Sequence, residues 1–443
     1  MTHSRSALRN LIVRVLQAGI AMVTSVVVTR MLGAEGRGAL ALLLVAPLLG
    51  ARMLSFGVES ALVVFAGKTG RRELIGHAGA VVALSGSVGM AAILGLQALG
   101  GLPGRELATF AVRALATLAL PLHLIAFAAN GLLRGAGRFE EYDRGLLVGP
   151  AVQLPLALLL LLGLGLGVAG GLGASVGAIG VTAGFLLVRV WLKIPDARPS
   201  LPKVSAPMLR FGLKEHAGNL AQYLNLRLDL LLVGIFLGPK ETGLYAVAVS
   251  LAEVVWFIPD ALGTVLLPRI ARTGADTARA AAAGACRIAL TISSAAALAI
   301  VLFGGTLLVV LYGHEFAGAW TPLAWLMPGV VLLSVSKVLS KHLSGTGHPG
   351  LSARASLISL IATLILDLAL IPTFGLAGAA LATTIAYGVH AALCTAGFRF
   401  LTGAPLAELA VPSGKDIRRV TTLIRDVFND LPGAARGSET AKG

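Results

Sequence analysis

The sequence predicts an all-α polytopic membrane protein, with about 12 transmembrane helices in two parallel six-helix repeats around a central cavity. Hydrophobic residues make up 56% of the chain and charged residues only 13%, whereas about a quarter of the residues of soluble globular proteins are charged. Apolar runs of about 20 residues, the length that crosses a bilayer as a helix, recur from one end of the chain to the other. Matching motifs also occur in the two halves at nearly constant spacing.

Each apolar run is taken as one span, because polar, charged or glycine-rich and proline-rich residues separate it from the next. The 12 spans cover residues 8–30, 39–66, 75–99, 107–133, 145–166, 170–192, 209–237, 243–268, 284–311, 320–342, 352–373 and 376–400. The first run, Leu11–Thr29, contains Arg14 and lacks a convincing cleavage site, so we expect a retained helix. Cys286 and Cys394 lie in apolar spans without metal-ligand spacing, and no disulfide can be inferred.

The net charge of +15 has a topological explanation. A strongly basic chain can indicate a nucleic-acid partner. Here the basic excess lies at the N-terminus, in the connections after even-numbered spans and in the C-terminal tail, as the positive-inside rule describes. We therefore expect both termini in the cytoplasm and no nucleic-acid partner.

One long polar break, Lys193–Pro207, predicts a proline-rich linker between the halves. It divides the chain into an N-terminal six-helix bundle (1–198), a C-terminal six-helix bundle (199–402) and a cytoplasmic tail (403–443). The tail contains a basic amphipathic stretch, Ser413–Phe428. We expect a solvated, partly disordered tail, with attachment to the inner membrane face as the alternative.

The two halves share three short motifs in the same order. The matched segments are 32–38 with 237–243 at an offset of 205, 133–137 with 343–347 at 210, and 167–170 with 375–378 at 208. Six spans per half is an even number, so both halves cross the membrane in the same orientation. Parallel repeats are related by an axis along the membrane normal, and they place a substrate path between them.

Polar residues at helical spacing predict which spans line that path. Span seven places a polar stripe on one helix face, and spans one, two and eight carry similar pairs. The residues are Glu215, Asn219, Gln222, Leu226 and Asp229 on span seven, Arg14, Gln17, Ala21 and Thr24 on span one, Arg52 and Glu59 on span two, and Glu253 and Asp260 on span eight.

Three segments carry a family resemblance. VTRMLGAEGRGALAL at the first connection, LDLLLVGIFLGPKETGLYAVA at span seven and LDLALIPTFGLAGAALAT at span eleven resemble the Wzx-type polysaccharide flippases. These belong to the multidrug/oligosaccharidyl-lipid/polysaccharide exporter superfamily, and the resemblance covers about residues 8–400. It implies two six-helix bundles in a V shape around a central cavity. It implies movement of undecaprenyl-diphosphate-linked oligosaccharide from the inner to the outer leaflet of the bacterial cytoplasmic (inner) membrane.

The resemblance also implies an energy source and partners. A proton or sodium gradient drives transport, and no other cofactor is expected. The expected partners are the lipid-linked glycan and membrane lipids, with a polysaccharide polymerase and glycosyltransferases as further candidates.

Arg52 is the first candidate for the substrate's diphosphate, because its position in the middle of span two is costly for a charge and guanidinium pairs well with diphosphate oxygens. The alternative is an ion pair with Glu59 or with a carboxylate of another helix. Arg14 and Arg227 are further cationic candidates, with snorkelling and ion pairing as their respective alternatives. Gln17, Asn219, Gln222 and Trp256 complete the predicted substrate-binding set.

Glu59, Asp229, Glu253 and Asp260 are the candidate coupling carboxylates, because a carboxylate in a dry cavity can take up a proton near neutral pH. Structural pairing with a nearby arginine is the alternative. Asp367 is assigned to packing or capping.

No nucleophile motif, phosphate-binding glycine loop or metal-ligand spacing occurs, so we expect a transporter and not an enzyme. A cation-coupled multidrug or small-solute exporter of the same superfamily is the alternative function. A cationic drug favours carboxylates without arginine, whereas a diphosphate favours arginine. A membrane-bound polymerase is a third hypothesis, and it would need a large outer loop, which the spans do not leave.

Overall fold

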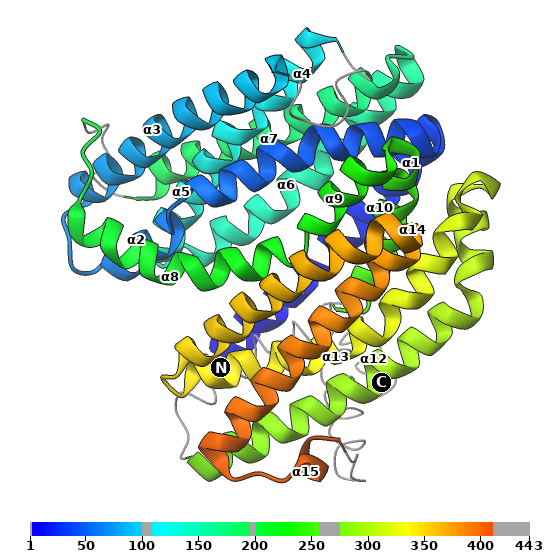
Figure 1. Cartoon of the computed structure of the whole chain (residues 1–443). Helices are drawn as coiled ribbons and strands as arrows, with labels where there is room; N and C mark the ends of the chain where they lie inside the picture. The colour runs from blue at the N-terminus through cyan, green and yellow to red at the C-terminus, as the bar shows by residue number, and fades with distance from the viewer. Residues whose placement is uncertain (1, 100–108, 195–200, 257–274, 411–443) are drawn as a thin grey trace, which may run out of the picture.

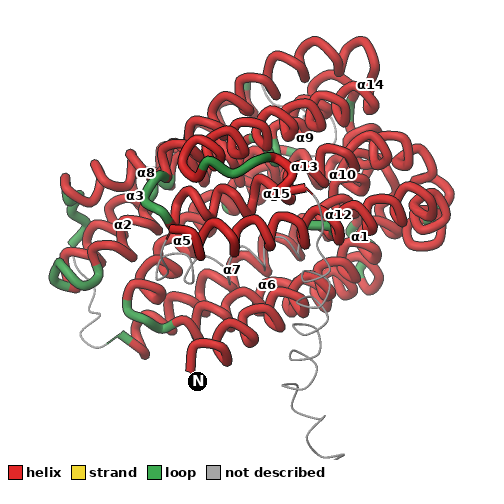
Figure 2. The backbone as a smooth tube through the Cα atoms, turned by 90° about the horizontal axis from the view of Figure 1, so that it is seen from below, coloured by secondary structure: helices red, strands yellow, loops and turns green. Residues whose placement is uncertain are grey.

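The computed structural model describes residues 2–99, 109–194, 201–256 and 275–410, and Figure 1 draws the others as a thin grey trace. The described residues form helices joined by short loops, without a strand among them, as Figure 2 shows. Eight of these helices are long and apolar enough to cross a membrane, or up to nine if one bent pair counts as a single span. The predicted fold class is therefore confirmed, while the count of 12 spans stays a prediction.

The first half contains seven α-helices and one π-helical segment in its described residues. They are α1 (Thr2–Leu54), α2 (Val58–Phe65), α3 (Arg71–Ala98), α4 (Phe110–Thr117), α5 (Ala119–Gly135), α6 (Phe139–Ala157), η2 (Leu158–Gly163, π-helical) and α7 (Gly167–Lys193). In the second half the elements are α8 (Ala206–Leu224), α9 (Leu228–Leu237), α10 (Pro239–Val254), α12 (Ala275–Tyr312), η3 (His314–Ala319, a 3₁₀ helix), α13 (Trp320–Gly345), α14 (Pro349–Thr402) and α15 (Leu406–Ala410).

Two pairs of predicted spans are joined by kinks and not by loops. Spans one and two share α1, which is kinked at Gly33, and spans eleven and twelve share α14, which is kinked at Gly375. Both glycines have positive φ, 67° and 58°, a conformation that only glycine adopts without strain. Arg37, which lies between the predicted spans one and two, is consequently inside α1, one turn beyond the kink.

Spans two and seven are each interrupted near their middle. Span two breaks at 55–57, between α1 and α2, and span seven breaks at 225–227, between α8 and α9, where the axis turns by 46°. The polar stripe predicted on span seven assumed one continuous helix, so it ends at this break and does not reach Asp229.

The helices form two groups with separate hydrophobic cores. In Figure 1, α3 to α7 lie on one side and α12 to α14 on the other, and α1, α9 and α10 lie where the groups meet. Buried side chains of α2, α3, α5, α6 and α7 form clusters in the first group, and those of α10, α12, α13 and α14 form clusters in the second. Each core also takes residues from the other half, since Met208 of α8 is buried in the first group and Ala34 of α1 in the second. The domain boundaries stay a prediction.

The repeat motifs meet each other where the groups join. A Cβ atom added to Gly38 of α1 would overlap the Pro239 carbonyl oxygen, and one added to Gly243 of α10 would overlap the Ala34 carbonyl oxygen. Gly38 and Gly243 are equivalent at the repeat offset of 205, and so are Ala34 and Pro239. The contact is therefore reciprocal, as expected for two like units around a pseudo-two-fold axis, and the absence of a side chain at both glycines lets the backbones touch.

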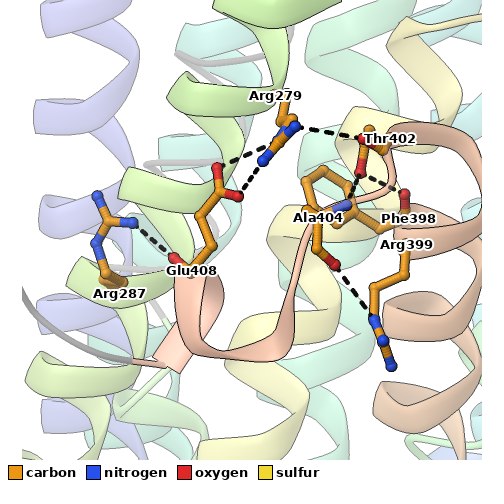
Figure 3. Close-up of polar contacts among 7 residues, drawn as sticks. All are labelled: Arg279, Arg287, Phe398, Arg399, Thr402, Ala404 and Glu408. Atoms are coloured by element: carbon orange, nitrogen blue, oxygen red, sulfur yellow. Dashed lines mark hydrogen bonds and ion pairs between the residues drawn. The ribbon is translucent and has the colours of Figure 1, made fainter.

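Residues 403–410, which we call the strap, return from the end of α14 to the beginning of α12 (Figure 3). The Glu408 carboxylate forms a salt bridge with Arg279, and its backbone carbonyl accepts a hydrogen bond of 2.6 Å from Arg287. Ala404 and Leu409 are buried in the apolar cluster formed by α12, α13 and α14. The strap thus fastens α12 to α14 at one end of the second group.

Candidate functional site

Arg52 occupies the last turn of α1, beside the break at 55–57. Its guanidinium lies 3.8 Å from the ring centroid of Phe127 on α5 and 5.1 Å from that of Tyr223 on α8. The predicted alternative, an Arg52–Glu59 ion pair, is wrong, because Glu59 pairs with Arg134 of α5 at 2.8 Å. Aromatic faces from both halves of the chain therefore hold Arg52, and no carboxylate among the described residues forms an ion pair with it.

The local backbone explains this placement. Phe56 and Gly57 both have positive φ, 46° and 69°, so the helix cannot continue past them. Ser55 donates its hydroxyl to the Arg52 carbonyl at 2.9 Å, and His216 of α8 lies 3.2 Å from the Met53 carbonyl. A cation in the last turn of a helix is also favoured by the helix dipole. Arg52 is consequently fixed at a helix end and not in the middle of a regular span.

Arg227 lies in the second break, immediately before α9. It forms a 2.9 Å ion pair with Glu253 of α10, and Tyr223 lies close to both Arg227 and Arg52. The break itself is held by Asn225, which donates to the Ser356 carbonyl of α14 at 3.1 Å. The structure thus brings together two predicted arginines and one predicted carboxylate around Tyr223, which the sequence analysis did not select.

Asp229 is buried one turn further along, among hydroxyl groups. One carboxylate oxygen accepts hydrogen bonds from Tyr245 at 2.7 Å and Thr383 at 3.3 Å. Asp367 of α14 lies within electrostatic range of Asp229 and is 0% exposed. Neither oxygen of Asp367 has a hydrogen-bond partner, so its assignment to capping is wrong.

The remaining predicted residues are less informative. Trp256 is 8% exposed, packs edge-on against Tyr387 and lies under Lys337, whose nitrogen is 4.8 Å from the ring centroid. Arg14, Gln17 and Gln222 are half-buried and Asn219 is exposed, while Asp260 lies outside the described residues. Among the described residues, no group of three or more His, Cys, Asp or Glu side chains could hold a metal ion.

Three arginines inside the membrane-spanning helices have buried N–H groups without a hydrogen-bond partner. They are Arg37 and Arg52 of α1 and Arg113 of α4. In the part of the chain that the structure describes, none of the three forms an ion pair with a carboxylate. Because an isolated buried charge is costly unless it is paired, this arrangement suits a protein that receives an anion between its helices.

Sequence reasoning selected Arg52 but missed its neighbours. Asp367, near Asp229, carries the same signal as Arg52, an ionisable residue deep in an apolar run. That signal was sufficient to select it as a candidate for coupling, but it was assigned to packing or capping. Phe127 and Tyr223 carry no such signal, because an aromatic residue in an apolar run is usually part of the packing.

Comparisons with known proteins agree with this fold. The sequence model of a family described as "polysaccharide biosynthesis protein" matches residues 4–274. The probable low-salt glycan biosynthesis flippase Agl15 of Haloferax volcanii is 26% identical over 234 residues, which is 51% of this chain and 49% of that protein. The match therefore spans about half the length of that relative.

Solved structures cover more of the chain at lower identity. The lipid II flippase MurJ, in an inward closed conformation, has a TM-score of 0.77 at 12% identity, over 90% of this chain and 88% of that chain. An inward-facing MATE multidrug resistance transporter of the MOP superfamily has a TM-score of 0.67 at 19% identity, over 90% and 98%. At these identities the likeness shows the fold alone. The predicted resemblance is confirmed, and the chain is a multi-pass membrane protein of the polysaccharide biosynthesis protein family.

Proposed function

We propose that this protein is a flippase that moves undecaprenyl-diphosphate-linked oligosaccharide from the inner to the outer leaflet by alternating access. The observation that carries the proposal is the set of intramembrane arginines, Arg37, Arg52 and Arg113, each of which has a buried Nε–H group without a hydrogen-bond partner. A diphosphate supplies several charged oxygens, and guanidinium binds such groups through two parallel hydrogen bonds. The family match and the flippase relative support the same substrate class.

Arg52 is suited to bind an anion reversibly. The rings of Phe127 and Tyr223 stabilise its charge by about 0.5–2 kcal/mol without neutralising it. An incoming diphosphate therefore does not have to displace a carboxylate. Tyr223 belongs to α8 and Phe127 to α5, so a change in the relative position of the two halves alters the surroundings of Arg52 and can help to release the substrate.

Asp229 and Asp367 form the site that we assign to coupling. Two neighbouring buried carboxylates cannot both remain charged without a large desolvation cost, so they hold a proton or a sodium ion. The Thr383 hydroxyl, 3.3 Å from the Asp229 carboxylate, adds an oxygen ligand. Glu59 and Glu253 already pair with arginines and are weaker candidates. Movement of this cation into the cell would drive substrate outward.

A cation-coupled multidrug exporter is the second candidate. The buried carboxylates and the likeness to multidrug transporters favour it, whereas the arginines disfavour a cationic substrate. We place either activity in the bacterial inner membrane with both termini in the cytoplasm. Glycosyltransferases and a polymerase would act before and after the flippase.

Reconstituted protein tests the proposal directly. Flipping of a fluorescent undecaprenyl-diphosphate sugar is measured by quenching with a membrane-impermeant reductant. Arg52→Ala should abolish flipping in protein that remains folded, and Arg52→Lys should restore it partly, because lysine lacks the bidentate fork. Arg144→Ala is the control for loss of an arginine that carboxylates already neutralise, since Arg144 pairs with Glu140 and Glu141 of its own helix, α6.

Two results would contradict the proposal. One is normal flipping by Arg52→Ala, which would place the residue outside the path. The other is a normal surface polysaccharide in a deletion strain that has no second flippase gene. If the deletion strain instead becomes sensitive to cationic dyes, the exporter is the better assignment.

A further inference from the structure

The kink of α1 contacts the end of α12 through two charged side chains. Arg30, three residues before Gly33, donates from Nε to the Leu311 carbonyl at 2.7 Å and from a second nitrogen to the Val310 carbonyl. Glu315, in η3, accepts the backbone N–H of Ala34 at 3.0 Å. Each half of the chain thus supplies one charged side chain to the other half.

Both contacts satisfy helix ends. Val310 and Leu311 belong to the last turn of α12, whose carbonyls have no donor within the helix. The non-helical backbone at Gly33 begins a new helical segment at Ala34, whose first N–H groups also lack a partner. A cation at a helix C-terminus and an anion at a helix N-terminus are each favoured by the helix dipole. Arg30 and Glu315 therefore cap helices in trans.

Each contact partner is anchored in a different half. Leu32 and Leu40, on either side of the kink, pack against α7 of the first group. Tyr312 and Phe316, on either side of the α12–η3 turn, are buried in the core of the second group. Movement of the α12–η3 turn away from the kink of α1 must therefore break both caps, while the contact of Ala34 with Gly243 can persist.

The pseudo-two-fold axis does not repeat these contacts. At the offset of 205, Arg30 corresponds to Ile235, whose side chain has no hydrogen-bond donor. Ala34 corresponds to Pro239, which has no backbone N–H. The contacts of Gly38 and Gly243 are reciprocal and can persist as a pivot. The two caps, by contrast, have no counterpart at the equivalent positions Ile235 and Pro239.

We propose that Arg30 and Glu315 form a latch that holds the two halves closed at the outer end of the molecule. The outer location and the role in transport rest on the proposed function and its topology. The latch sets how often this end opens, so it controls release of substrate and not its recognition. Both side chains are exposed, so each contact should shift the closed–open equilibrium about twofold to fivefold, and both together about tenfold.

Cysteine labelling measures the open population without substrate. Ser25 lies one turn from Met22, whose sulfur accepts the Tyr312 hydroxyl at 3.6 Å, and the Ser25 hydroxyl is buried. Ser25→Cys is therefore the reporter, in a chain whose Cys286 and Cys394 are replaced by alanine. Right-side-out vesicles are treated with a membrane-impermeant maleimide, and the labelling rate reports opening.

Arg30→Gln and Glu315→Gln should each raise the rate about twofold to fivefold, and the double variant about tenfold. Glu35→Gln and Lys240→Gln are the matched controls, because they remove exposed charges beside the same joint that make no latch contact. An unchanged rate in the double variant, or an equal rise in the controls, would overturn the latch.

A second measurement compares the response to salt with and without the latch. Choline chloride at about 1 M shortens the Debye length to about 3 Å. It should raise labelling of the reporter with an intact latch, and it should leave the double variant unchanged. Equal responses would contradict the proposal. Because labelling requires no substrate, the latch can fail while Arg52-dependent flipping stands, and the reverse is equally observable.

Discussion

Replacement of Asp367 by asparagine separates a coupling role from a structural one. The side chain is 0% exposed and neither carboxylate oxygen has a hydrogen-bond partner. Asparagine has nearly the same shape, lacks the charge and cannot take up a proton. The substitution therefore removes the proposed cation site at Asp229 and Asp367 without creating a cavity.

The expected energies differ enough to be measured. An ionised carboxylate at this position would cost several kcal/mol of desolvation. A neutral acid and an amide without partners each cost about 1–3 kcal/mol. When the Asp367 carboxyl is protonated, the unfolding free energies of the wild type and of Asp367→Asn, measured without sodium, should therefore agree within about 1–2 kcal/mol. The wild type alone should gain stability from the bound cation, by about 2.7 kcal/mol when its concentration is 100 times Kd.

Thermal unfolding of purified protein in detergent provides the assay, with NaCl exchanged for choline chloride at low and at high pH. The wild type should be stabilised by the coupling cation, whereas Asp367→Asn should not respond and should lose gradient-driven flipping. Asp276→Asn, at the exposed start of α12, is the control. The reasoning is refuted if Asp367→Asn keeps both the cation response and gradient-driven flipping. A large loss of stability without the cation would instead indicate a structural group.

Three further predictions concern packing, recognition and topology. Gly243→Ala should destabilise the protein by about 1–3 kcal/mol or prevent folding, since its Cβ would overlap the Ala34 carbonyl. Gly19→Ala, with open space around it, should not destabilise the protein, and thermal unfolding of both variants checks the difference. Phe127→Leu should weaken binding of a diphosphate analogue about twofold to thirtyfold through loss of the cation–π contact with Arg52, and unchanged affinity in a binding titration would argue against that contact. Single cysteines at positions 70, 140, 200, 275 and 348 should react with a label supplied from the cytoplasmic side. Labelling of the linker position, 200, from the outside would overturn the two-repeat scheme.

Much of the fold follows from the sequence, because apolar runs, basic loops and glycine motifs are local signals. The paired motifs predicted two like units, and the contact of Gly38 with Pro239 and of Gly243 with Ala34 agrees with that prediction. The kinks within α1 and α14 were harder to predict from the sequence. A glycine with positive φ lets a helix change direction without a loop. The residues around Gly33 resemble those of an ordinary loop between two spans, so the sequence did not distinguish the two.

The site was predicted in part. Arg52 was selected by the cost of a charge in an apolar run. The alternative, an ion pair with Glu59, is wrong because Glu59 was placed by helical spacing and pairs with Arg134 instead. That spacing holds only along an unbroken helix, and the backbone at Phe56 and Gly57 interrupts it. Contacts between distant segments, such as Arg52 with Tyr223, depend on how the halves dock, and no local pattern encodes that.

The strap determines where the protein can be cut or fused. Arg287 of α12 donates a hydrogen bond to the Glu408 carbonyl, 121 residues further along the chain, so this end of α12 is completed only after all of α14 has been synthesised. A reporter joined directly after Thr402 would remove Glu408 together with the buried Ala404 and Leu409. It would then measure the sidedness of a damaged bundle. A fusion placed beyond Ala410 keeps these contacts of the strap, and it is the better attachment point for tags and topology reporters.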